Sequence, residues 1–525
     1  MKRFFPYPLF LITAIVLDRV AISTAQIAFG HSLRALLILL LSAVVVLYII
    51  QYFSKDWHYT NFIVMMIPVA LITYRFLFRL LKSNFPHQAN ALGIALIIVL
   101  GLLYVAFVNP RKWRLIHNPA RLTKYFNFVF IVLLSLQAIR LRQDSYQAFT
   151  NLTHPRTTAF SSLDENIKLK EGASPDIYVI VLDGYARQDV LQTIYQHDNS
   201  DFIGWLENEG FYVAEDSHSN YVQTPYAMSS FWNFDYLPTW DSSYDYAQYL
   251  FEPIQDNHVF QMLDEIGYTT VSFEQAVYYA EIKNSDVYLS NFLPLNNFET
   301  LLLVDSPLEP LSNIFDLKLP LYTYETHRQR LLFQLDTLKE IPESISGPKI
   351  VYAHILAPHP PFVFSQSGES LEPDQPFTLA EGIGNQEGTE TYWDGYQQQV
   401  KFINEKVTEV INTILKKSDS TPIIVLMSDH GPGSMFKWDR EDPGCLWERT
   451  GNLYAILLPG HQGDKQMYSS ISPVNSFRVI FNTYFGTELP LLDDRSYLMY
   501  WYEPTLKVDI TDTRDTRAGC TLPNQ

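Results

Sequence analysis

The sequence predicts a two-part α/β protein. A bundle of about five transmembrane helices precedes a domain whose mostly parallel sheet is covered by helices on both faces. Long apolar stretches are confined to residues 1–143 of the 525, and short apolar runs alternate with helical patterns in the remainder. The charge divides in a similar way, since residues 1–150 carry a net +12 and residues 151–525 a net −30. So large an acidic excess makes the second part a poor binder of nucleic acid.

Residues 1–143 contain five apolar stretches, each close to the ~20 residues that a helix needs to cross a bilayer. A cleaved signal peptide would instead show one short apolar region followed by a soluble chain. Buried core helices are the alternative, but five such stretches in series leave no polar face for water. We therefore predict a transmembrane domain. The stretches are Leu9–Phe29, Leu33–Phe53, Phe62–Leu81, Ala91–Val108 and Phe126–Leu141.

Lys and Arg in the short loops indicate how these helices are oriented. With the N-terminus inside, eight basic residues fall on the inner side and five on the outer side. An odd number of spans then places everything after residue 143 outside the cytoplasm, and the orientation must be derived again if the first stretch does not span. The five outer residues are Arg34, Arg79, Lys82, Arg140 and Arg142.

Asp18 and Arg19 fall in the middle of the first apolar stretch, where ionisable groups are expensive and often functional. Adjacent helix residues point ~100° apart, so the two charges do not simply neutralise each other. They either pack against a neighbouring helix or handle a lipid head group.

Residues 144–174 are polar and lack periodicity, and we predict a juxtamembrane linker there. Residues 175–504 alternate fully apolar runs with helical patterns, which is typical of a mostly parallel sheet that is buried on both faces. Residues 505–525 are polar and are predicted to form a loose tail. The predicted strands are Ile177–Leu182, Tyr268–Phe273, Lys349–His354, Pro422–Met427 and Leu453–Leu458.

Three helices are predicted between these strands. Gly210 follows the helix Asn199–Glu209 and Gly267 follows Asp256–Ile266, as glycine often does at a helix C-terminus. The third, Thr391–Lys417, has its apolar residues on one face and ends in two lysines, which suit the negative end of the helix dipole.

Two of the strands end at residues that can bind a metal ion. Asp183 is the first polar residue after Ile177–Leu182, and Asp429 and His430 stand in the same relation to Pro422–Met427. Taken singly, such a residue is usually a cap or a turn residue. In an open α/β sheet, however, ligands gather beyond the carboxyl ends of the strands, so both sites reach the same edge. Carboxylate and imidazole ligands favour zinc or manganese over calcium.

Two further segments offer polar groups. Thr224 precedes Pro225, so it is predicted as a helix N-cap, and a hydroxyl at a helix N-terminus can also stabilise a phosphate or a developing anion. His354 comes at the end of a predicted strand, and His359 lies among three prolines that fix its backbone. Ordinary packing is the alternative role for both histidines.

The order of these segments resembles that of the alkaline phosphatase/sulfatase superfamily. The matching features are an Asp-Gly after the first strand, a Thr at a helix start, a His-x-Pro-Phe-like segment and a late Ser-Asp-His-Gly. Five N-terminal spans before such a domain resemble the membrane branch, which contains the lipoteichoic acid synthases and phosphoethanolamine transferases. Bacterial membrane-bound sulfatase-like proteins are a closer match, and Ser472–Arg478 is a further shared feature. Each motif alone is unspecific, whereas the ordered set from about residue 175 to 500 is specific.

The resemblance implies roles for individual residues. Thr224 would be the nucleophile, with its hydroxyl made more acidic by one bound divalent metal ion. His359, Ser434 and His354 would lie on the substrate side. A second metal ion would need further ligands, for which His354, His359 and His461 are candidates. The implied ligands of the first metal ion are Asp183, Thr224, Asp429 and His430.

Two departures from the family pattern bear on the substrate. The segment that begins at Thr224 lacks the Cys or Ser that sulfatases convert to formylglycine, and neither Cys445 nor Cys520 lies in it. Asp183 replaces the glutamate of the lipoteichoic branch. The resemblance therefore implies a membrane-anchored phosphotransferase or phosphodiesterase. It would act on a phospholipid head group or a cell-surface glycan through a covalent phospho-threonine.

Two other functions compete with this one. The first is a sulfatase-like ester hydrolase, and the second is a non-catalytic membrane protein whose outer domain binds a surface polymer. The complete ligand set favours an enzyme, because a binding module has no need of it. Two cysteines are too few for a disulfide framework, and whether Cys445 and Cys520 pair stays open at this point.

Overall fold

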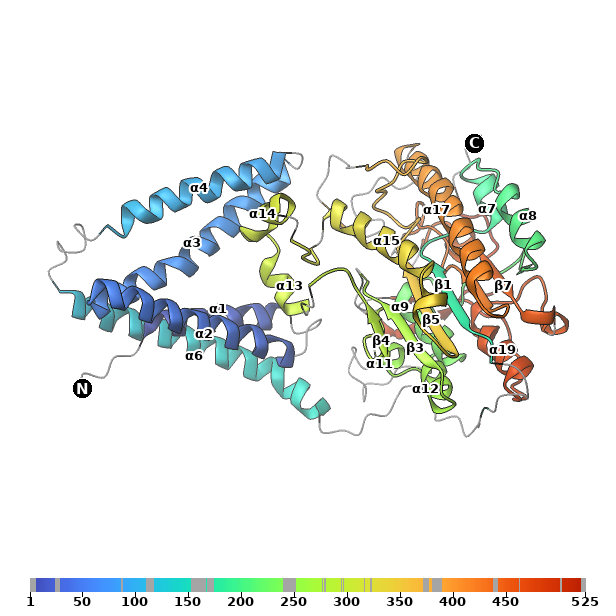
Figure 1. Cartoon of the computed structure of the whole chain (residues 1–525), viewed down its shortest axis with the longest axis horizontal. Helices are drawn as coiled ribbons and strands as arrows, with labels where there is room; N and C mark the ends of the chain where they lie inside the picture. Colours follow the sequence, from blue (N-terminus) through green and yellow to red (C-terminus); the bar gives the residue numbers. More distant parts are fainter. Residues whose placement is uncertain are drawn as a thin grey trace. The chain divides into compact units, whose positions relative to one another are not determined.

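The computed structural model divides the chain into two compact units (Figure 1). The first contains residues 1–155 together with 292–322 and 374–376, and the second contains residues 156–291, 323–373 and 377–525. The residues that the structure describes are 6–23, 29–85, 88–109, 118–152, 167, 174–238, 252–275, 277, 280–293, 295, 297–315, 317–321, 323–371, 377–379, 390–437, 442–461, 463–500 and 503–520.

Long helices dominate the described part of the first unit. The third of them is capped by Asp56, whose carboxylate accepts hydrogen bonds from the backbone N–H groups of His58 and Tyr59. The first and last pack through aromatic rings, with the Tyr7 ring centroid 5.3 Å from that of Phe126. The long helices are α1 (Tyr7–Ser23), α2 (Phe29–Ser54), α3 (Trp57–Asn84), α4 (Ala89–Phe107) and α6 (Pro119–Leu152). The same unit also contains two shorter helices, α13 (Asn297–Leu303) and α14 (Leu308–Phe315).

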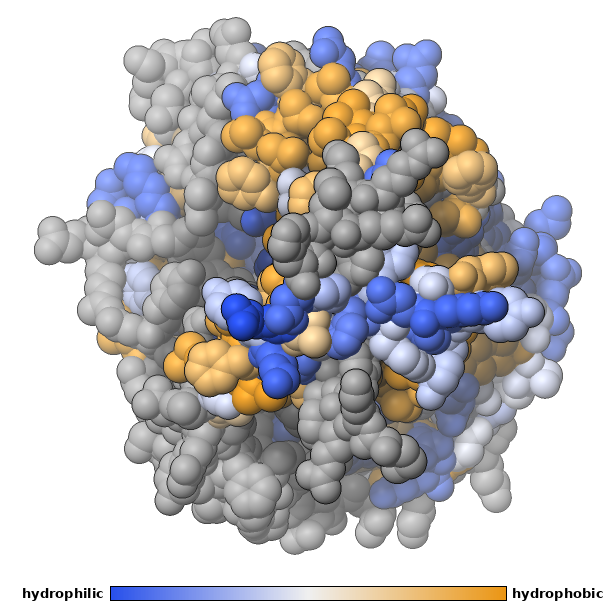
Figure 2. Space-filling model, turned by 90° about the vertical axis from the view of Figure 1, so that its left-hand side faces the viewer, coloured by the Kyte–Doolittle hydropathy of each residue, from blue (hydrophilic) through white to orange (hydrophobic). Residues whose placement is uncertain are grey.

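Four helices among the described residues are long and apolar enough to cross a membrane. α1 has 17 residues and overlaps the first predicted stretch from Leu9 to Ser23. At 1.5 Å per residue it is ~25 Å long, slightly less than a bilayer core, so the count of five spans stays a prediction. At the end of the first unit shown in Figure 2, a hydrophilic band crosses the middle and apolar residues cover a broad area above it. The four segments are Ser32–Ser54, Trp57–Asn84, Ala89–Phe107 and Pro119–Ala138.

A seven-stranded sheet forms the centre of the second unit, in the order β2-β7-β6-β1-β5-β3-β4. The strands from β6 to β4 are parallel, and β7 is antiparallel to both β6 and β2. The predicted fold class and all five predicted strands are therefore confirmed. The strands are β1 (Ile177–Leu182), β2 (Tyr212–Val213), β3 (Thr269–Phe273), β4 (Val287–Leu289), β5 (Lys349–Ile355), β6 (Ile423–Met427) and β7 (Tyr454–Leu457), with β8 (Tyr497–Tyr500) and β9 (Glu503–Asp509) in a separate pair.

Helices cover both faces of this sheet, and β1 shows why its sequence is apolar throughout. Tyr178, Ile180 and Leu182 pack with residues of α7, α8, α15 and α17, whereas the alternate residues pack with α9, α12 and α19. Because neither face meets water, every position of β1 carries an aliphatic or aromatic residue. The helices are α7 (Gln188–Thr193), α8 (Ser200–Asn208), α9 (Thr224–Asn233), α11 (Glu252–Gln255), α12 (His258–Glu265), α15 (Tyr324–Leu338), α16 (Ile341–Ser344), α17 (Glu390–Lys417), α18 (Leu446–Thr450) and α19 (Ser476–Tyr484).

The structure differs from the predicted boundaries in three places. α6 continues past residue 143 to Leu152, because no proline or glycine interrupts the chain before Pro155. The second difference concerns residues 505–525, which were predicted to form a loose tail. The described part of this segment, up to Cys520, packs on the fold instead. β9 pairs with β8, and Ile510 is buried against an apolar cluster. Residues 292–322 lie within the predicted α/β domain of 175–504, yet they pack in the first unit.

A disulfide bond between Cys445 and Cys520 closes the question that the sequence left open. It joins the residue that precedes α18 to the C-terminal segment, across 75 residues of chain. Cross-linking two distant points of the chain removes conformational freedom from the unfolded state and thereby stabilises the fold.

We expect Cys520→Ser to lower the free energy of unfolding of the second unit by about 2–4 kcal/mol, because the unfolded chain regains the freedom of a long loop. The check is a denaturant titration of the full-length protein in detergent, with and without a reducing agent. The wild type should become as unstable as the variant on reduction, and the variant should not respond. Equal stability of wild type and variant would show that the disulfide does not stabilise the fold.

Candidate active site

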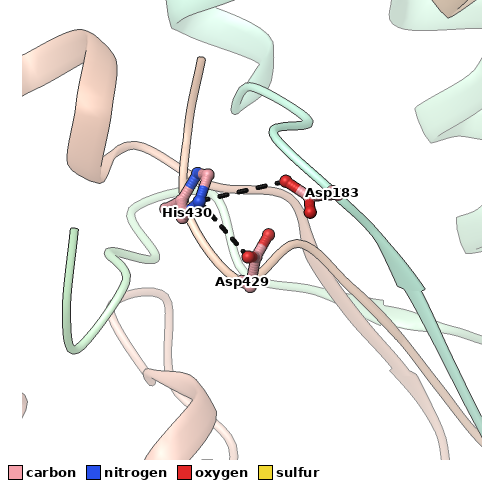
Figure 3. Close-up of side chains that lie close together, drawn as sticks. All are labelled: Asp183, Asp429 and His430. Carbon is pink, nitrogen blue, oxygen red and sulfur yellow. Dashed lines mark ion pairs between the residues drawn. The ribbon is translucent and has the colours of Figure 1, made fainter. Parts of the chain in front are cut away.

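Two neighbouring parallel strands bring the predicted metal ligands together. The register of β1 and β6 pairs Val181 with Met427, so the residues that follow each strand lie at the same sheet edge. Asp183 is 3% exposed, and Asp429 and His430 are each 1% exposed. One ligand atom from each of these three residues lies within 4.8 Å of the other two, and Figure 3 shows the three side chains turned toward one another. His430 Nε2 is 3.3 Å from Asp429 Oδ2 and 3.9 Å from Asp183 Oδ1.

The Thr224 hydroxyl reaches the same place from α9. Its Oγ1 lies 3.2 Å from His430 Nε2, and the residue is 7% exposed. The predicted N-cap role is wrong, since Gln223 takes the cap position and Thr224 is the first residue of the helix. Pro225 favours this helix start because its fixed φ suits the first turn. The hydroxyl therefore points at the histidine rather than closing the end of its own helix.

The carboxylates of this group are suited to a cation. Among the residues that the structure describes, Asp183 Oδ1 and Asp429 Oδ2 are buried atoms with no hydrogen-bond partner. A buried carboxylate oxygen without a donor is costly, and a bound metal ion would satisfy both. Two carboxylates, an imidazole nitrogen and a hydroxyl oxygen form a donor set that a divalent transition metal accepts.

His354 supports Asp183 from the neighbouring strand. It is fully buried in β5, and its Nε2 lies 3.2 Å from Asp183 Oδ2, while Nδ1 lies 3.1 Å from the Tyr352 hydroxyl. Burial alone raises the pKa of Asp183, but the positive charge of His359 and the hydrogen bond with His354 outweigh it. The net effect holds the pKa of Asp183 below its usual value. Asp183 is therefore ionised at neutral pH and ready to bind a cation.

His359 lies next to Asp183 through the backbone. Its N–H donates to the Asp183 carbonyl oxygen at 2.9 Å. Gly184 has a φ of +70°, and a Cβ there would lie 3.6 Å from His359 Cα. The glycine thus permits the left-handed turn that brings the two segments together.

Ser434 has other partners than the sequence implied. It is 1% exposed, its hydroxyl donates to Glu448 Oε1 at 2.5 Å, and it lies 3.4 Å from Trp393 Nε1. Glu448 also accepts the hydroxyl of Tyr195 at 2.5 Å. The described contacts therefore place Ser434 in a buried hydrogen-bond network around Glu448. Its predicted role on the substrate side stays a prediction.

Arg449 is a candidate site residue that the sequence did not reveal. The side chain is buried, and its Nη2 lies 3.2 Å from His430 Nε2. Its Nε donates to the carbonyl oxygen of Val222 at 2.8 Å, and Nη1 donates to that of Gly431 at 3.2 Å. One guanidinium thus joins the segment before Thr224 to the segment after His430. No motif marks this position, because the residue acts through a fold contact between distant segments.

A buried ionisable group on α15 also lies near the site. Burial lowers the pKa of His327 to about 3, and the positive charges of Arg330 and His359 act in the same direction. The imidazole is therefore neutral at pH 7. Arg330 itself pairs with Glu274, which directly follows β3, at 2.7 Å.

The fold and the buried ligand group define a metal-dependent enzyme of the sulfatase type. The sulfatase family profile matches residues 175–470, more than half of the chain, and the protein belongs to this family. The predicted superfamily is thereby confirmed, and with it a hydrolase or phosphotransferase activity. A comparison with curated protein sequences gave no match.

Several solved structures are similar to the chain. The C-terminal periplasmic domain of EcEptC from Escherichia coli in complex with Zn is 11% identical, with a TM-score of 0.44, covering 69% of this chain and 100% of that one. The integral membrane protein lipooligosaccharide phosphoethanolamine transferase A (EptA) from Neisseria meningitidis is 13% identical, with a TM-score of 0.38, covering 91% and 95%. The phosphonate monoester hydrolase of Agrobacterium radiobacter is 12% identical, with a TM-score of 0.40, covering 62% and 80%.

We expect Asp429→Asn to lose most of the bound metal without unfolding the protein, because the amide is nearly the same size but carries no charge. Asp201→Asn, at an exposed position of α8, is the matched control and should keep its metal. The measurement is metal content per protein by elemental mass spectrometry, with circular dichroism as the check on folding. Full metal occupancy in Asp429→Asn would remove this residue from the ligand set.

Proposed function

We propose that the protein is a membrane-anchored, metal-dependent phosphotransferase or phosphodiesterase that uses Thr224 as its nucleophile. The observation that supports this most directly is the position of the Thr224 hydroxyl, 3.2 Å from His430 Nε2 and at the first residue of a helix. Membership of the sulfatase family supplies the reaction type, which is displacement at a phosphate or sulfate ester.

Four residues would hold the metal ion, which we propose to be zinc or manganese. A bound divalent ion lowers the pKa of a coordinated hydroxyl and neutralises the charge of an ester oxygen. The side chains that would bind it come from three separate segments. The strand or helix next to each segment fixes the direction of its side chain. The proposed ligands are Asp183, Thr224, Asp429 and His430.

In the proposed first step, Thr224 Oγ1 forms a bond to phosphorus and the bond between phosphorus and the leaving lipid alcohol breaks. The threonine gives up its hydroxyl proton, and the departing oxygen takes up a proton. In the second step, the oxygen of water or of an acceptor hydroxyl forms a bond to phosphorus and loses its proton, and the bond between phosphorus and Thr224 Oγ1 breaks. The threonine oxygen then regains a proton, which restores the starting state. The positive end of the α9 helix dipole would stabilise the phosphate oxygens, and we propose that the His359 side chain contacts them.

A phosphate ester is favoured over a sulfate ester by one feature of the nucleophile. Thr224 is not a Cys or Ser, so it cannot become the formylglycine that sulfatases use. The second alternative, a non-catalytic polymer-binding protein, does not explain why two carboxylates are buried without hydrogen-bond donors at their free oxygens. We propose a phospholipid head group as the donor, with a glycan, a lipid or water as the acceptor.

We propose that the second unit lies outside the cytoplasm. The Lys and Arg distribution in the loops favours this side. The disulfide between Cys445 and Cys520 supports it, because disulfide bonds persist mainly in oxidising compartments.

We expect Thr224→Val to lower turnover of an aryl phosphodiester such as bis-p-nitrophenyl phosphate by at least about 10³-fold, because the isosteric side chain has no hydroxyl to attack phosphorus. Thr224→Ser is the matched control and should keep part of the activity. Mass spectrometry of the wild type after incubation with membrane lipids should show a phosphate-bearing adduct on Thr224. Near-normal turnover by Thr224→Val would refute the covalent mechanism.

We expect an alkaline phosphatase reporter fused after Arg142 to be active in intact cells, because that enzyme folds only where disulfides form. A β-galactosidase reporter at the same position should be inactive. The opposite pair of results would place the second unit in the cytoplasm and overturn the proposed orientation.

A further inference from the structure

Residues 292–322 leave the second unit after β4 and return to it before α15, and in between they pack in the first unit. Within that unit α13 contacts α2 and α14 contacts α4. Figure 1 shows the two short helices beside the long ones. A segment of the chain that follows the membrane helices by 140 residues or more in the sequence therefore forms part of their packed unit.

Three acidic residues attach this segment to the long helices. Asp305 accepts from Arg79 at 2.9 Å and Glu309 accepts from Lys82 at 2.6 Å. The third pair joins Glu299 to Arg34. The acidic side chains are 6–10% exposed, so their charges face the helices and not water.

These pairs place the segment at one end of the helices. Arg79 and Lys82 lie in the last turns of α3, and Arg34 lies near the start of α2. Consecutive membrane helices run in opposite directions, so the end of α3 and the start of α2 are on the same side of the bilayer. α13 and α14 therefore lie at the interface where these helices leave the lipid.

α14 turns its acidic side chain and a hydroxyl inward and three large apolar side chains outward. Glu309 and Ser312 are 5% and 6% exposed, whereas Leu308, Ile314 and Phe315 are 41%, 57% and 65% exposed. Leu308 and Phe315 are seven residues apart and thus share one face of the helix. A helix on a water-soluble surface shows the reverse arrangement. The outer face of α14 is therefore built for an apolar environment.

We propose that residues 292–322 form a membrane-interface segment whose α14 inserts its apolar face at the boundary between lipid head groups and acyl chains. The bilayer is the occupant that fits, because α14 contacts α4, a helix long and apolar enough to cross a membrane. Leu80 and Phe85, at the same end of α3, are 55% and 51% exposed. A short helix with one apolar face lies in the plane of the interface in this way.

The acidic residues explain why this end of the helices can carry basic residues. Arg34, Arg79 and Lys82 are three of the five that the predicted orientation places on the outer side, against the general preference for the inner side. Each is paired with a carboxylate of the segment. The segment thus neutralises the charge at the point where it enters the interface.

The test uses Phe315→Cys in the full-length protein, labelled with bimane and reconstituted in phosphatidylcholine vesicles. Both native cysteines are in the disulfide, so under non-reducing conditions the introduced thiol is the one that reacts. Brominated acyl chains should quench the label, and aqueous iodide should leave it unchanged. Glu207→Cys, at an exposed position of α8, is the control and should show the opposite pattern.

Leu308→Cys provides a second label on the same face, in case Phe315→Cys does not fold. Loss of fluorescence with iodide but not with brominated lipid at both positions would place α14 in water and overturn the proposal. Protection from both quenchers would also overturn it, because protein would then cover the face, either a second copy of the chain or another part of the same one.

Discussion

Two carboxylates at the ends of adjacent parallel strands impose the main constraint on this molecule. β1 and β6 run side by side, so Asp183 and Asp429 cannot lie far apart once the sheet has formed. Both are buried, and each keeps one oxygen without a hydrogen-bond donor among the described residues. The surrounding elements then act to compensate for like charges at close range. His354 contacts one carboxylate, His430 lies between the two, and Arg449 lies against that histidine.

The residues around these two carboxylates come from segments that are distant in the sequence and that contact one another at several points. Gly431 has no room for a side chain, since a Cβ there would overlap the carbonyl oxygen of Glu448. The segment that follows His430 is thus pressed against α18, which carries Arg449 on its inner side. The disulfide at Cys445 joins the residue before α18 to the C-terminal segment. A residue 90 positions after His430 in the sequence, Cys520, therefore helps to position the histidine's neighbours.

Periodicity and strand order were enough to predict the sheet and the convergence of Asp183, Asp429 and His430, because apolar strands and parallel edges follow general rules. They were not enough for Arg449 or for the partners of Ser434, which depend on contacts between distant segments. The position of residues 292–322 was also beyond prediction. Its amphipathic pattern is the same whether the apolar side faces a core or lipid, and only the burial of Glu309 distinguishes the two. Similarly, Leu506, Val508 and Ile510 alternate with polar residues in a short polar tail, and the sequence does not show that β8 pairs with this segment or that Ile510 is buried in an apolar cluster.

The pairing of the basic helix ends with residues 292–322 also bears on the order in which the two partners are synthesised. Arg79 and Asp305 are 226 residues apart in the sequence. At bacterial and eukaryotic synthesis rates of roughly 5–20 residues per second, the arginine leaves the ribosome about 10–45 s before its carboxylate partner. In the proposed arrangement, α2 and α3 would enter the bilayer during that interval, before the acidic partners of their basic residues are synthesised. The proposed orientation would then depend on the Lys and Arg residues alone, and the acidic segment would pair with them afterwards.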